Sequence, residues 1–358
     1  MNKDLHGGNI YKFQREGKND ILDYSSNINP LGVSQKFIDI AKESFDKLVN
    51  YPDPYYIELR KKIAEFNSLD MDNIIVGNGA TEILFLYIRA LKPKKVLILA
   101  PCFAEYERAL KSVSAKIEYF ELKESNNFYP NIINLKEEVK NNNYDLLLFC
   151  NPNNPTGQFI KLEDIKEIIE TCENKNTKIF IDEAFIEFIE NWKEKTVSLL
   201  KNKNIFIMRA FTKFFAIPGL RLGYGIGFDD EVLKKMWEEK EPWTVNTFAN
   251  LAGLIMLDDK EYIEKSEKWI LEEKKFMYEE LSKFQNIKIY KTECNFILIK
   301  LSNISSESLR EKMIERNILI RDASNFKFLD NHFVRLAIKD RKSNLKILET
   351  LADFVEYK

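Results

Sequence analysis

Short apolar segments alternate with amphipathic segments along the first two thirds of the chain. Seven apolar runs have the length of single strands, at residues 74–76, 96–99, 117–120, 146–150, 179–181, 205–208 and 222–226. Amphipathic stretches between them predict helices at 81–91, 103–112 and 162–174. This alternation is typical of a mostly parallel sheet that helices cover on both faces. Ligands of such α/β proteins gather at the carboxyl ends of the strands.

The pattern changes after about residue 242. A long, highly charged segment predicts a helix over 260–284, and shorter elements follow: strands at 287–290, 296–301, 318–321 and 333–338, and helices at 306–316 and 342–357. We therefore divide the chain into an N-terminal arm and helix over 1–45, a large domain over 46–241, and a smaller α+β domain over 242–358 that includes the long linking helix.

The N-terminal arm contains one predicted amphipathic helix. Ser34 can cap its first turn, because a serine oxygen accepts a hydrogen bond from a free backbone N–H at a helix start. Phe37, Ala41, Phe45 and Leu48 follow at helical spacing, so we expect them to share one face.

Composition excludes several classes of function. The chain has 358 residues, of which 45% are hydrophobic and 31% charged, and its formal net charge is −2. It can therefore bury a sizeable core, and it lacks the positive charge typical of nucleic-acid or membrane partners. The longest apolar runs are too short to span a bilayer, and the polar first residues do not resemble a secretory signal.

Cysteine and histidine positions offer no metal site. The four cysteines are scattered without a Cys-x-x-Cys pair, which favours reduced thiols in a cytoplasmic protein. The only histidines are His6 and His332, too few for a histidine-rich metal site or a Ser/His/Asp triad. Taken alone, either histidine is more typical of packing or of the surface than of catalysis.

Residues 212–224 carry the most informative chemistry. Lys213 lies on a short predicted turn after an apolar strand, and Arg221 follows eight residues later. A lysine in a low-dielectric site can lose its proton and attack a carbonyl, and an arginine can hold a phosphate in fork geometry. An aldehyde cofactor that carries a phosphate needs both groups. We therefore expect pyridoxal 5'-phosphate (PLP), with Lys213 as its Schiff-base partner; the alternative is an ordinary turn with a surface lysine.

Four other positions fall where a cofactor pocket at a sheet edge needs them. The turn Gly-Asn-Gly-Ala-Thr at 77–81 opens a helix, whose free N–H groups favour an anion. Two prolines and a glycine around Asn154 predict a rigid turn. Asp182 ends a buried strand and needs a positive partner, such as a protonated pyridine nitrogen. Phe103 can stack on a flat ring. Each position alone also fits a structural role: a plain turn, a loop cap or a core phenylalanine.

Other cofactor patterns are absent from the sequence. Gly223, Gly225 and Gly227 do not have the Gly-x-Gly-x-x-Gly spacing of a dinucleotide-binding turn, and no Walker pattern occurs.

The order of these motifs resembles the fold-type I PLP-dependent enzymes of the aspartate aminotransferase superfamily, over essentially the whole chain. That resemblance implies a large domain with a mostly parallel central sheet flanked by helices, and a smaller α+β C-terminal domain. Within the superfamily, the chain is similar both to histidinol-phosphate aminotransferases and to the threonine-phosphate decarboxylases of cobalamin biosynthesis. The second likeness is the better one, on the motifs at 6–9, 27–32, 51–53, 212–221, 242–246 and 318–321. Phe185 also favours it, because histidinol-phosphate aminotransferases usually have tyrosine there.

The resemblance implies a role for each matching residue. Lys213 would carry the cofactor, Asp182 would pair with its ring nitrogen, Asn154 with its ring oxygen, and Phe103 would stack on the ring. Its phosphate would be held by Gly79, Ala80, Thr81 and Arg221, with Thr212 nearby and Tyr51 reaching in from the other subunit of a homodimer. Arg335 would bind the substrate carboxylate, while His6, Asn27 and Arg321 would line the substrate side, His6 and Arg321 facing a substrate phosphate.

One residue departs from the pattern. The resembling enzymes usually have a serine two or three residues before the lysine, where it bonds the cofactor phosphate, and this chain has Ala210. Losing a hydrogen bond to a charged group costs about 1.5–3 kcal/mol, so we expect weaker retention of PLP. Thr212 is placed to compensate in part.

The activity that the resemblance implies is decarboxylation of L-threonine O-3-phosphate to 1-amino-2-propanol O-2-phosphate, for the nucleotide loop of cobalamin. L-Serine phosphate, which would give ethanolamine phosphate, differs by one methyl group and remains an alternative. A histidinol-phosphate-type aminotransferase is another, and it would require a keto acid. A PLP-fold transcriptional regulator would need a DNA-binding domain and a basic patch, for which the sequence has no sign.

Overall fold

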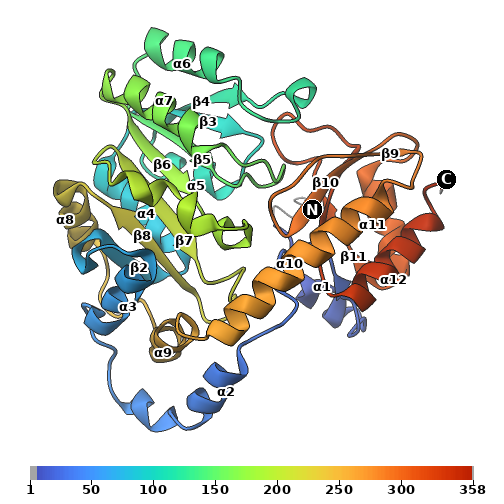
Figure 1. The fold of residues 1–358 in the computed structure, drawn as a ribbon, viewed down its shortest axis with the longest axis horizontal. Helices are drawn as coiled ribbons and strands as arrows, with labels where there is room; N and C mark the ends of the chain where they lie inside the picture. Colours follow the sequence, from blue (N-terminus) through green and yellow to red (C-terminus); the bar gives the residue numbers. More distant parts are fainter. Residues whose placement is uncertain (1–5, 357–358) are drawn as a thin grey trace.

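A seven-stranded sheet forms the centre of the larger of two lobes in the computed structural model, which describes residues 6–356 (Figure 1). In spatial order its strands are β2 (Ile74–Asn78), β8 (Leu222–Gly227), β7 (Ile205–Ala210), β6 (Lys178–Asp182), β5 (Leu146–Cys150), β3 (Lys95–Ala100) and β4 (Lys116–Glu121). Neighbouring strands are parallel except around β8, which is antiparallel to both β2 and β7. The prediction of a mostly parallel sheet is confirmed.

The reversed direction of β8 determines where the lysine turn lies. The chain leaves β7 at Ala210 and enters β8 at Leu222, so residues 211–221 connect the two strands at the edge where the parallel strands end. The backbone N–H of Phe211 donates to the carbonyl of Leu222 at 3.1 Å, which closes the base of this connection. Lys213 and Arg221 are therefore both held at the carboxyl edge of the sheet.

Helices cover both faces of this sheet. One face carries α4 (Ala80–Leu91), α5 (Glu105–Lys111) and α8 (Asp230–Glu239), and the other carries α3 (Ile57–Asn67), α6 (Ile132–Asn141), α7 (Leu162–Glu173) and α9 (Thr247–Met256). Successive residues of β3 alternate between the two apolar layers: Ile98 packs with the first set and Leu97 with the second. This burial explains why the strands are apolar throughout.

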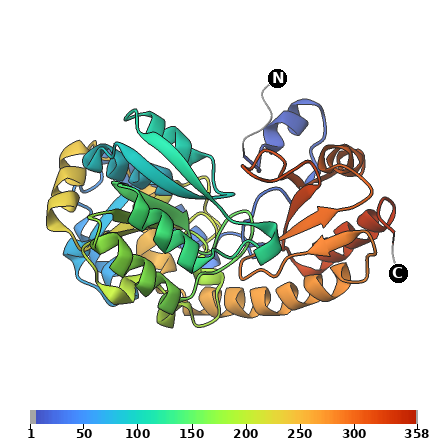
Figure 2. The ribbon, with the colours of Figure 1, turned by 90° about the horizontal axis from the view of Figure 1, so that it is seen from above.

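The smaller lobe contains an antiparallel sheet of four strands: β12 (Arg321–Asp322), β13 (Phe333–Ala337), β10 (Phe296–Leu301) and β9 (Ile287–Ile289). It also contains α11 (Ser306–Glu315) and α12 (Arg341–Ala352), while α10 (Lys260–Leu281) runs along both lobes (Figure 2). In the N-terminal arm, α1 (Ile10–Arg15) is followed by β1 (Leu22–Asp23), which pairs in parallel with β11 (Ile318–Leu319). The domain boundaries near residues 45 and 242 stay a prediction.

Two predicted elements are divided in the structure. The single strand at 318–321 is wrong: β11 pairs with β1, Ile320 belongs to neither strand, and β12 pairs with β13. The helix of the arm is also shorter than predicted. Ser34 accepts from the N–H of Phe37 as expected, but α2 (Gln35–Lys42) ends before Phe45 and Leu48.

The apolar residues beyond α2 face outward instead of extending its buried face. They belong to a short 3-10 helix (Phe45–Val49), in which Phe45 is 62% and Leu48 51% exposed. The last helix likewise ends earlier than predicted, at Ala352. Residue 357, its predicted end, lies outside the described residues.

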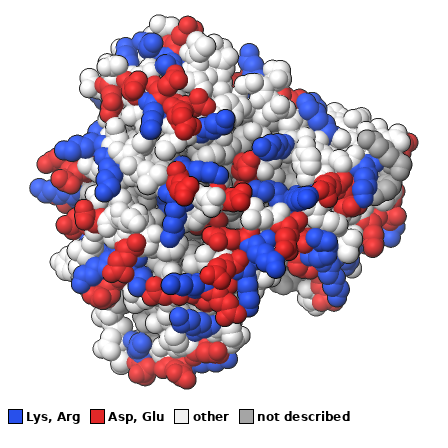
Figure 3. All heavy atoms as spheres, viewed as in Figure 1, with Lys and Arg blue, Asp and Glu red and all other residues white. Residues whose placement is uncertain are grey.

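The surface carries both signs of charge. Figure 3 shows lysine and arginine side chains interspersed with aspartate and glutamate over the face in view. Each of the four cysteines is buried and unpaired. Within residues 6–356, no helix combines the length and the apolar composition needed to cross a bilayer.

A buried ion pair joins the ends of β6 and β7. Both side chains are fully buried, and Arg209 donates to Glu183 Oε2 from Nη2 at 2.7 Å and from Nε at 3.0 Å. Thr196 Oγ1 accepts from Arg209 at 2.5 Å and donates to Glu183 at 2.8 Å. Because Glu183 follows Asp182 and Arg209 precedes Ala210, the pair fixes the two strand ends that carry predicted site residues.

Arg209→Met should destabilise the protein strongly, because Glu183 would remain buried without its cation. We expect the free energy of unfolding to fall by about 3–5 kcal/mol in urea denaturation. The control is Arg316→Met, which removes an exposed pair with Asp353 (3.2 Å) and should cost less than about 1 kcal/mol. Equal, small losses in the two variants would contradict this role.

Candidate active site

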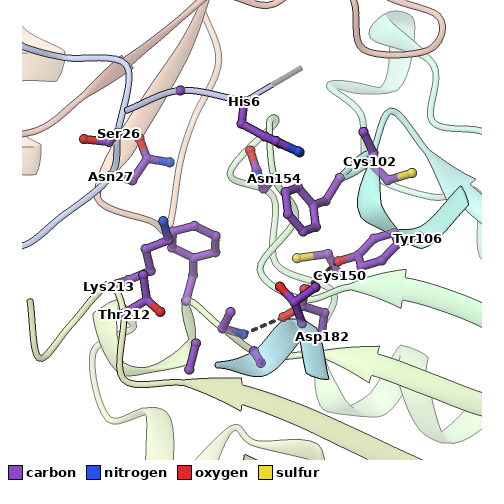
Figure 4. A pocket seen from close by; sticks show the side chains of 18 of the residues that line it. His6, Ser26, Asn27, Cys102, Tyr106, Cys150, Asn154, Asp182, Thr212 and Lys213 are labelled. Carbon is purple, nitrogen blue, oxygen red and sulfur yellow. Dashed lines mark hydrogen bonds between the residues drawn. The ribbon is translucent and has the colours of Figure 1, made fainter. Parts of the chain in front are cut away.

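A cavity of about 280 Å³ lies at the carboxyl ends of the strands, where the two lobes and the N-terminal arm meet (Figure 4). Most of the predicted site residues line it: His6, Asn27, Ala80, Thr81, Phe103, Asn154, Asp182, Thr212, Lys213, Arg221, Arg321 and Arg335. Two predicted residues, Gly79 and Tyr51, do not. Residues from distant parts of the sequence therefore converge on one space.

Lys213 enters this cavity from the connection between β7 and β8. Figure 4 shows it with Thr212 on one side, and Asp182, Tyr106 and Cys150 on another. Burial, and after it the positive charges of Arg335 and Arg221, lowers the pKa of Lys213 to about 8. A much larger fraction of its amine is then neutral near pH 7 than for an ordinary lysine, as a nucleophilic lysine requires.

Asp182 ends β6 with both carboxylate oxygens engaged. Oδ2 accepts from the hydroxyl of Tyr106 at 2.6 Å, and Oδ1 accepts from the N–H of Ala184 at 2.9 Å. Burial raises the pKa of Asp182 to about 6, although both hydrogen bonds oppose that shift. A cationic group in the cavity would keep this carboxylate ionised.

Tyr106 is a site residue that the sequence did not reveal. It lies in α5, three residues after Phe103, and its fully buried ring resembles that of an ordinary core residue. Only the fold brings its hydroxyl to Asp182, 76 positions away in the chain.

The start of α4 and Arg221 form an anion site. Gly79 has φ +76°, and a Cβ there would lie 2.4 Å from Arg221 Nη2, so only glycine lets the guanidinium approach this closely. The N–H of Gly79 donates to the carbonyl of Arg221 at 2.9 Å, which fixes the turn. The N–H groups at the start of a helix have no partner within the helix. Those of Ala80 and Thr81, beside the guanidinium, favour a phosphate.

Arg321 and Arg335 are buried neighbours on adjacent strands. They face each other in the register of β12 and β13, and they are only 6% and 5% exposed. Burial, and next the charge of Arg321, lowers the pKa of Arg335 to about 9. Two like charges in a low-dielectric site repel each other, and anionic groups nearby lower that cost. This side of the cavity therefore favours anionic groups of a ligand.

Arg335 is held in place with part of its guanidinium unused. Nη1 donates to Asn154 Oδ1 at 2.5 Å and Nη2 to the carbonyl of Ser25 at 2.6 Å. Its Nε is buried with no hydrogen-bond partner in the described part of the chain, and the same holds for Oδ1 of Asn27. Buried polar atoms without a partner are rare, so both residues have unused hydrogen-bonding capacity beside the cavity.

The N-terminal arm forms part of the cavity wall through His6 and Gly7. His6 Nε2 lies 2.8 Å from Glu105 Oε1, and its ring is centred 5.4 Å from that of Phe103. A Cβ on Gly7 would lie 2.0 Å from the carbonyl oxygen of Ser25, so the arm packs closely against the chain there. The second histidine, His332, contacts Asp330 and does not line the cavity.

Tyr51 lies outside the cavity of its own chain. It is 80% exposed and packs against Trp243, with ring centroids 4.8 Å apart. Its contact residue Trp243 is also exposed, as are large apolar side chains close to Tyr51 in the sequence: Phe45, Leu48, Val49 and Tyr55. We call these five residues and Tyr51 the apolar patch.

The sequence belongs to the family of class I and II aminotransferases, whose family model matches residues 19–351. It is 42% identical over 353 residues to a Caldanaerobacter subterraneus protein provisionally named threonine-phosphate decarboxylase, covering 98% of this chain and 94% of that protein. It is 33% identical over 349 residues to the threonine-phosphate decarboxylase of Salmonella typhimurium, covering 97% and 95%.

Solved structures share the same architecture. The histidinol-phosphate aminotransferase from Clostridium acetobutylicum matches with a TM-score of 0.88 at 38% identity, over 93% of this chain and 98% of that one. The prediction of a fold-type I aminotransferase architecture, with a large domain and a smaller α+β domain, is confirmed.

The low pKa of Lys213 can be measured in the cofactor-free protein. Acylation by acetic anhydride, followed by peptide mapping, should reach half its maximal rate near pH 8 at Lys213, because only the neutral amine reacts. Lys265 is the internal control: its hydrogen bond to Glu261 raises its pKa above the ordinary 10.5. A midpoint for Lys213 as high as that of Lys265 would show that the cavity does not activate it.

Proposed function

We propose that this protein is a PLP-dependent decarboxylase that converts L-threonine O-3-phosphate into 1-amino-2-propanol O-2-phosphate and carbon dioxide. The observation that carries the proposal is that Arg321 and Arg335 face each other, buried, at the cavity wall, since a small substrate with a carboxylate and a phosphate close together could present one anionic group to each arginine. The names of the two relatives described above support the same substrate. We extend the proposal to cobalamin biosynthesis, the pathway that the sequence resemblance implies.

The residues of the cavity fit PLP. Asp182, ionised by a positive partner, would pair with the ring nitrogen, and the anion site of Ala80, Thr81 and Arg221 would hold the phosphate. Asn154 accepts from Arg335 through Oδ1, which leaves its Nδ2 to donate to the ring oxygen. Lys213 would bind the aldehyde carbon. PLP, when bound there, would accept the electron pair left on the substrate Cα.

The arginines would decide which bond to Cα breaks. Arg335, with Asn27, would bind the substrate carboxylate, and Arg321, with His6, the substrate phosphate. Two fixed anchors set the rotation about Cα, so positioning selects the bond from Cα to the carboxylate over the bond to hydrogen. That bond breaks, carbon dioxide leaves, and its electron pair stays with Cα. Lys213 or a water then donates one proton to Cα, which completes the amine product.

Two other enzyme activities remain alternatives. Serine phosphate lacks only one methyl group, a difference worth about 1–3 kcal/mol in an apolar pocket. The similarity to a histidinol-phosphate aminotransferase, at 38% identity, supports transamination as the other alternative. Phe185 supports decarboxylation: it is buried against Phe296, with rings 5.2 Å apart, and it has no hydroxyl to offer a cofactor oxygen.

We propose a homodimer in which the apolar patch is the interface and Tyr51 reaches the cofactor phosphate of the partner subunit. Contiguous exposed apolar side chains on a soluble protein commonly mark such contacts. We also propose the cytoplasm as the compartment, because four unpaired cysteines are typical of reducing conditions.

The activity test mixes protein, PLP and L-threonine phosphate without any keto acid. We expect stoichiometric release of carbon dioxide and of 1-amino-2-propanol phosphate, and none from Lys213→Ala. Lys265→Ala, which changes an exposed lysine on α10, is the matched control and should retain activity. No carbon dioxide, with conversion of the cofactor to its amine form by a phosphorylated amine, would favour the aminotransferase.

The subunit contact has its own test. Sedimentation equilibrium should give twice the chain mass of 42.2 kDa, and Trp243→Asp should shift the protein toward monomers, because it introduces a charge into the apolar patch. Monomeric wild-type protein that retains full activity would contradict a shared site.

Ala210 is expected to weaken the hold on PLP. It is buried at the end of β7 and lines the cavity, so the hydroxyl of Ala210→Ser would face the phosphate side. Wild-type protein should lose PLP on dialysis, and Ala210→Ser should retain it about ten times more tightly or better, as one hydrogen bond to a charged group allows. Tight retention in both proteins would contradict this reading.

A further inference from the structure

The segment between β12 and β13 forms part of the cavity wall beside Arg321. Asn325 Oδ1 accepts from Arg321 Nη2 at 2.8 Å, and the ring of Phe326 is centred 5.2 Å from Arg321 Cζ. Phe326 is 8% exposed and lines the cavity. It therefore presents an apolar surface immediately next to the guanidinium that is proposed to bind the substrate phosphate.

This wall is held from both lobes. The N–H of Phe326 donates to the carbonyl of Ala323 at 3.1 Å, which closes a turn within the segment. On the side of the large lobe, Lys327 Nζ lies 4.2 Å from the ring centroid of Tyr119 in β4, and the ring of Phe328 is centred 6.4 Å from the same ring. The backbone that carries Phe326 is thus anchored on both sides of the cavity, as discrimination between similar substrates requires.

The other large apolar side chains of the cavity are engaged elsewhere. Phe103 is proposed to stack on the cofactor, and Phe185 lies near Lys213, whose Nζ is 6.0 Å from its ring centroid. Leu84 of α4 and Met208 of β7 are buried in the apolar layer between the central sheet and the helices α4, α5 and α8. Among the cavity residues in the described part of the chain, Phe326 is the one that joins an apolar surface to Arg321.

Threonine phosphate carries its methyl group and its phosphate oxygen on the same carbon. Once Arg321 holds the phosphate, the methyl group lies only two bonds from the ester oxygen, on the carbon that carries it. We propose that Phe326 contacts this methyl group and makes the enzyme prefer threonine phosphate to serine phosphate. The inference rests on the proposed function and specifies its substrate.

The test compares kcat/KM for the two substrates in wild-type protein, Phe326→Leu and Phe326→Ala. A methyl group in an apolar pocket is worth about 10- to 200-fold in kcat/KM, so wild type should prefer threonine phosphate within that range. Phe326→Ala should bring the ratio close to one, mainly through loss of threonine phosphate activity, and Phe326→Leu should keep most of the preference. Leu345→Ala, on the exposed face of α12, should leave the ratio unchanged.

The outcomes separate this inference from the function on which it rests. Equal losses of kcat/KM for both substrates in Phe326→Ala would mean that Phe326 only supports Arg321. A wild-type preference for serine phosphate would show that the cavity has no favourable contact for the methyl group. Either result overturns the inference and leaves the proposed decarboxylase activity intact. No carbon dioxide from either substrate with wild-type protein would overturn the proposed function itself.

Discussion

The site depends on an excess of positive charge around one cavity. Lys213, Arg221, Arg321 and Arg335 line one cavity, and Asp182 is the single carboxylate among its described lining residues. Cations taken out of water are costly unless anions accompany them. Burial, and after it the positive charges of Arg335 and Arg221, lowers the pKa of Lys213, so the cavity that favours an anionic ligand also prepares the amine for attack on a carbonyl.

The fold places these charges in pairs on separate elements. Arg221 reaches the cavity because β8 runs against the other strands, and a turn that only glycine can form receives its guanidinium. Arg321 and Arg335 come from paired strands of the small lobe. One pair thus belongs to the lobe proposed to hold the cofactor phosphate and the other to the lobe proposed to hold the substrate. The cofactor phosphate, the substrate carboxylate and the substrate phosphate would therefore each bind at a separate place in the cavity.

Residues that end an apolar strand were predictable from the sequence. Asp182 follows a buried strand, and Lys213 lies in a turn after another, so the rule for α/β sheets is enough to bring them together. Contacts between distant segments were not predictable. The hydroxyl of Tyr106 and the carbonyl of Ser25 engage site residues 76 and 310 positions away, and neither carries a local signal.

The same limit explains the errors in the predicted elements. Residues 318–321 have the composition of one strand, but two different partner strands divide them, and the choice of partner is a property of the tertiary structure. Phe45 and Leu48 continue the apolar period of the arm helix, yet they face outward in the apolar patch. The spacing of apolar residues in a sequence shows which side chains are apolar. It does not show which part of the protein, or which partner, covers them.

The most direct test of the account follows the fate of Cα itself. L-Threonine phosphate is incubated with the PLP-loaded protein in deuterium oxide, and carbon dioxide release is compared with deuterium entry at Cα of the unreacted substrate. If Arg335 and Arg321 hold the bond between Cα and the carboxylate carbon in position to break, carbon dioxide release should far exceed deuterium entry at Cα. Rapid exchange with little carbon dioxide would show that the two arginines present the hydrogen instead, and would contradict the account.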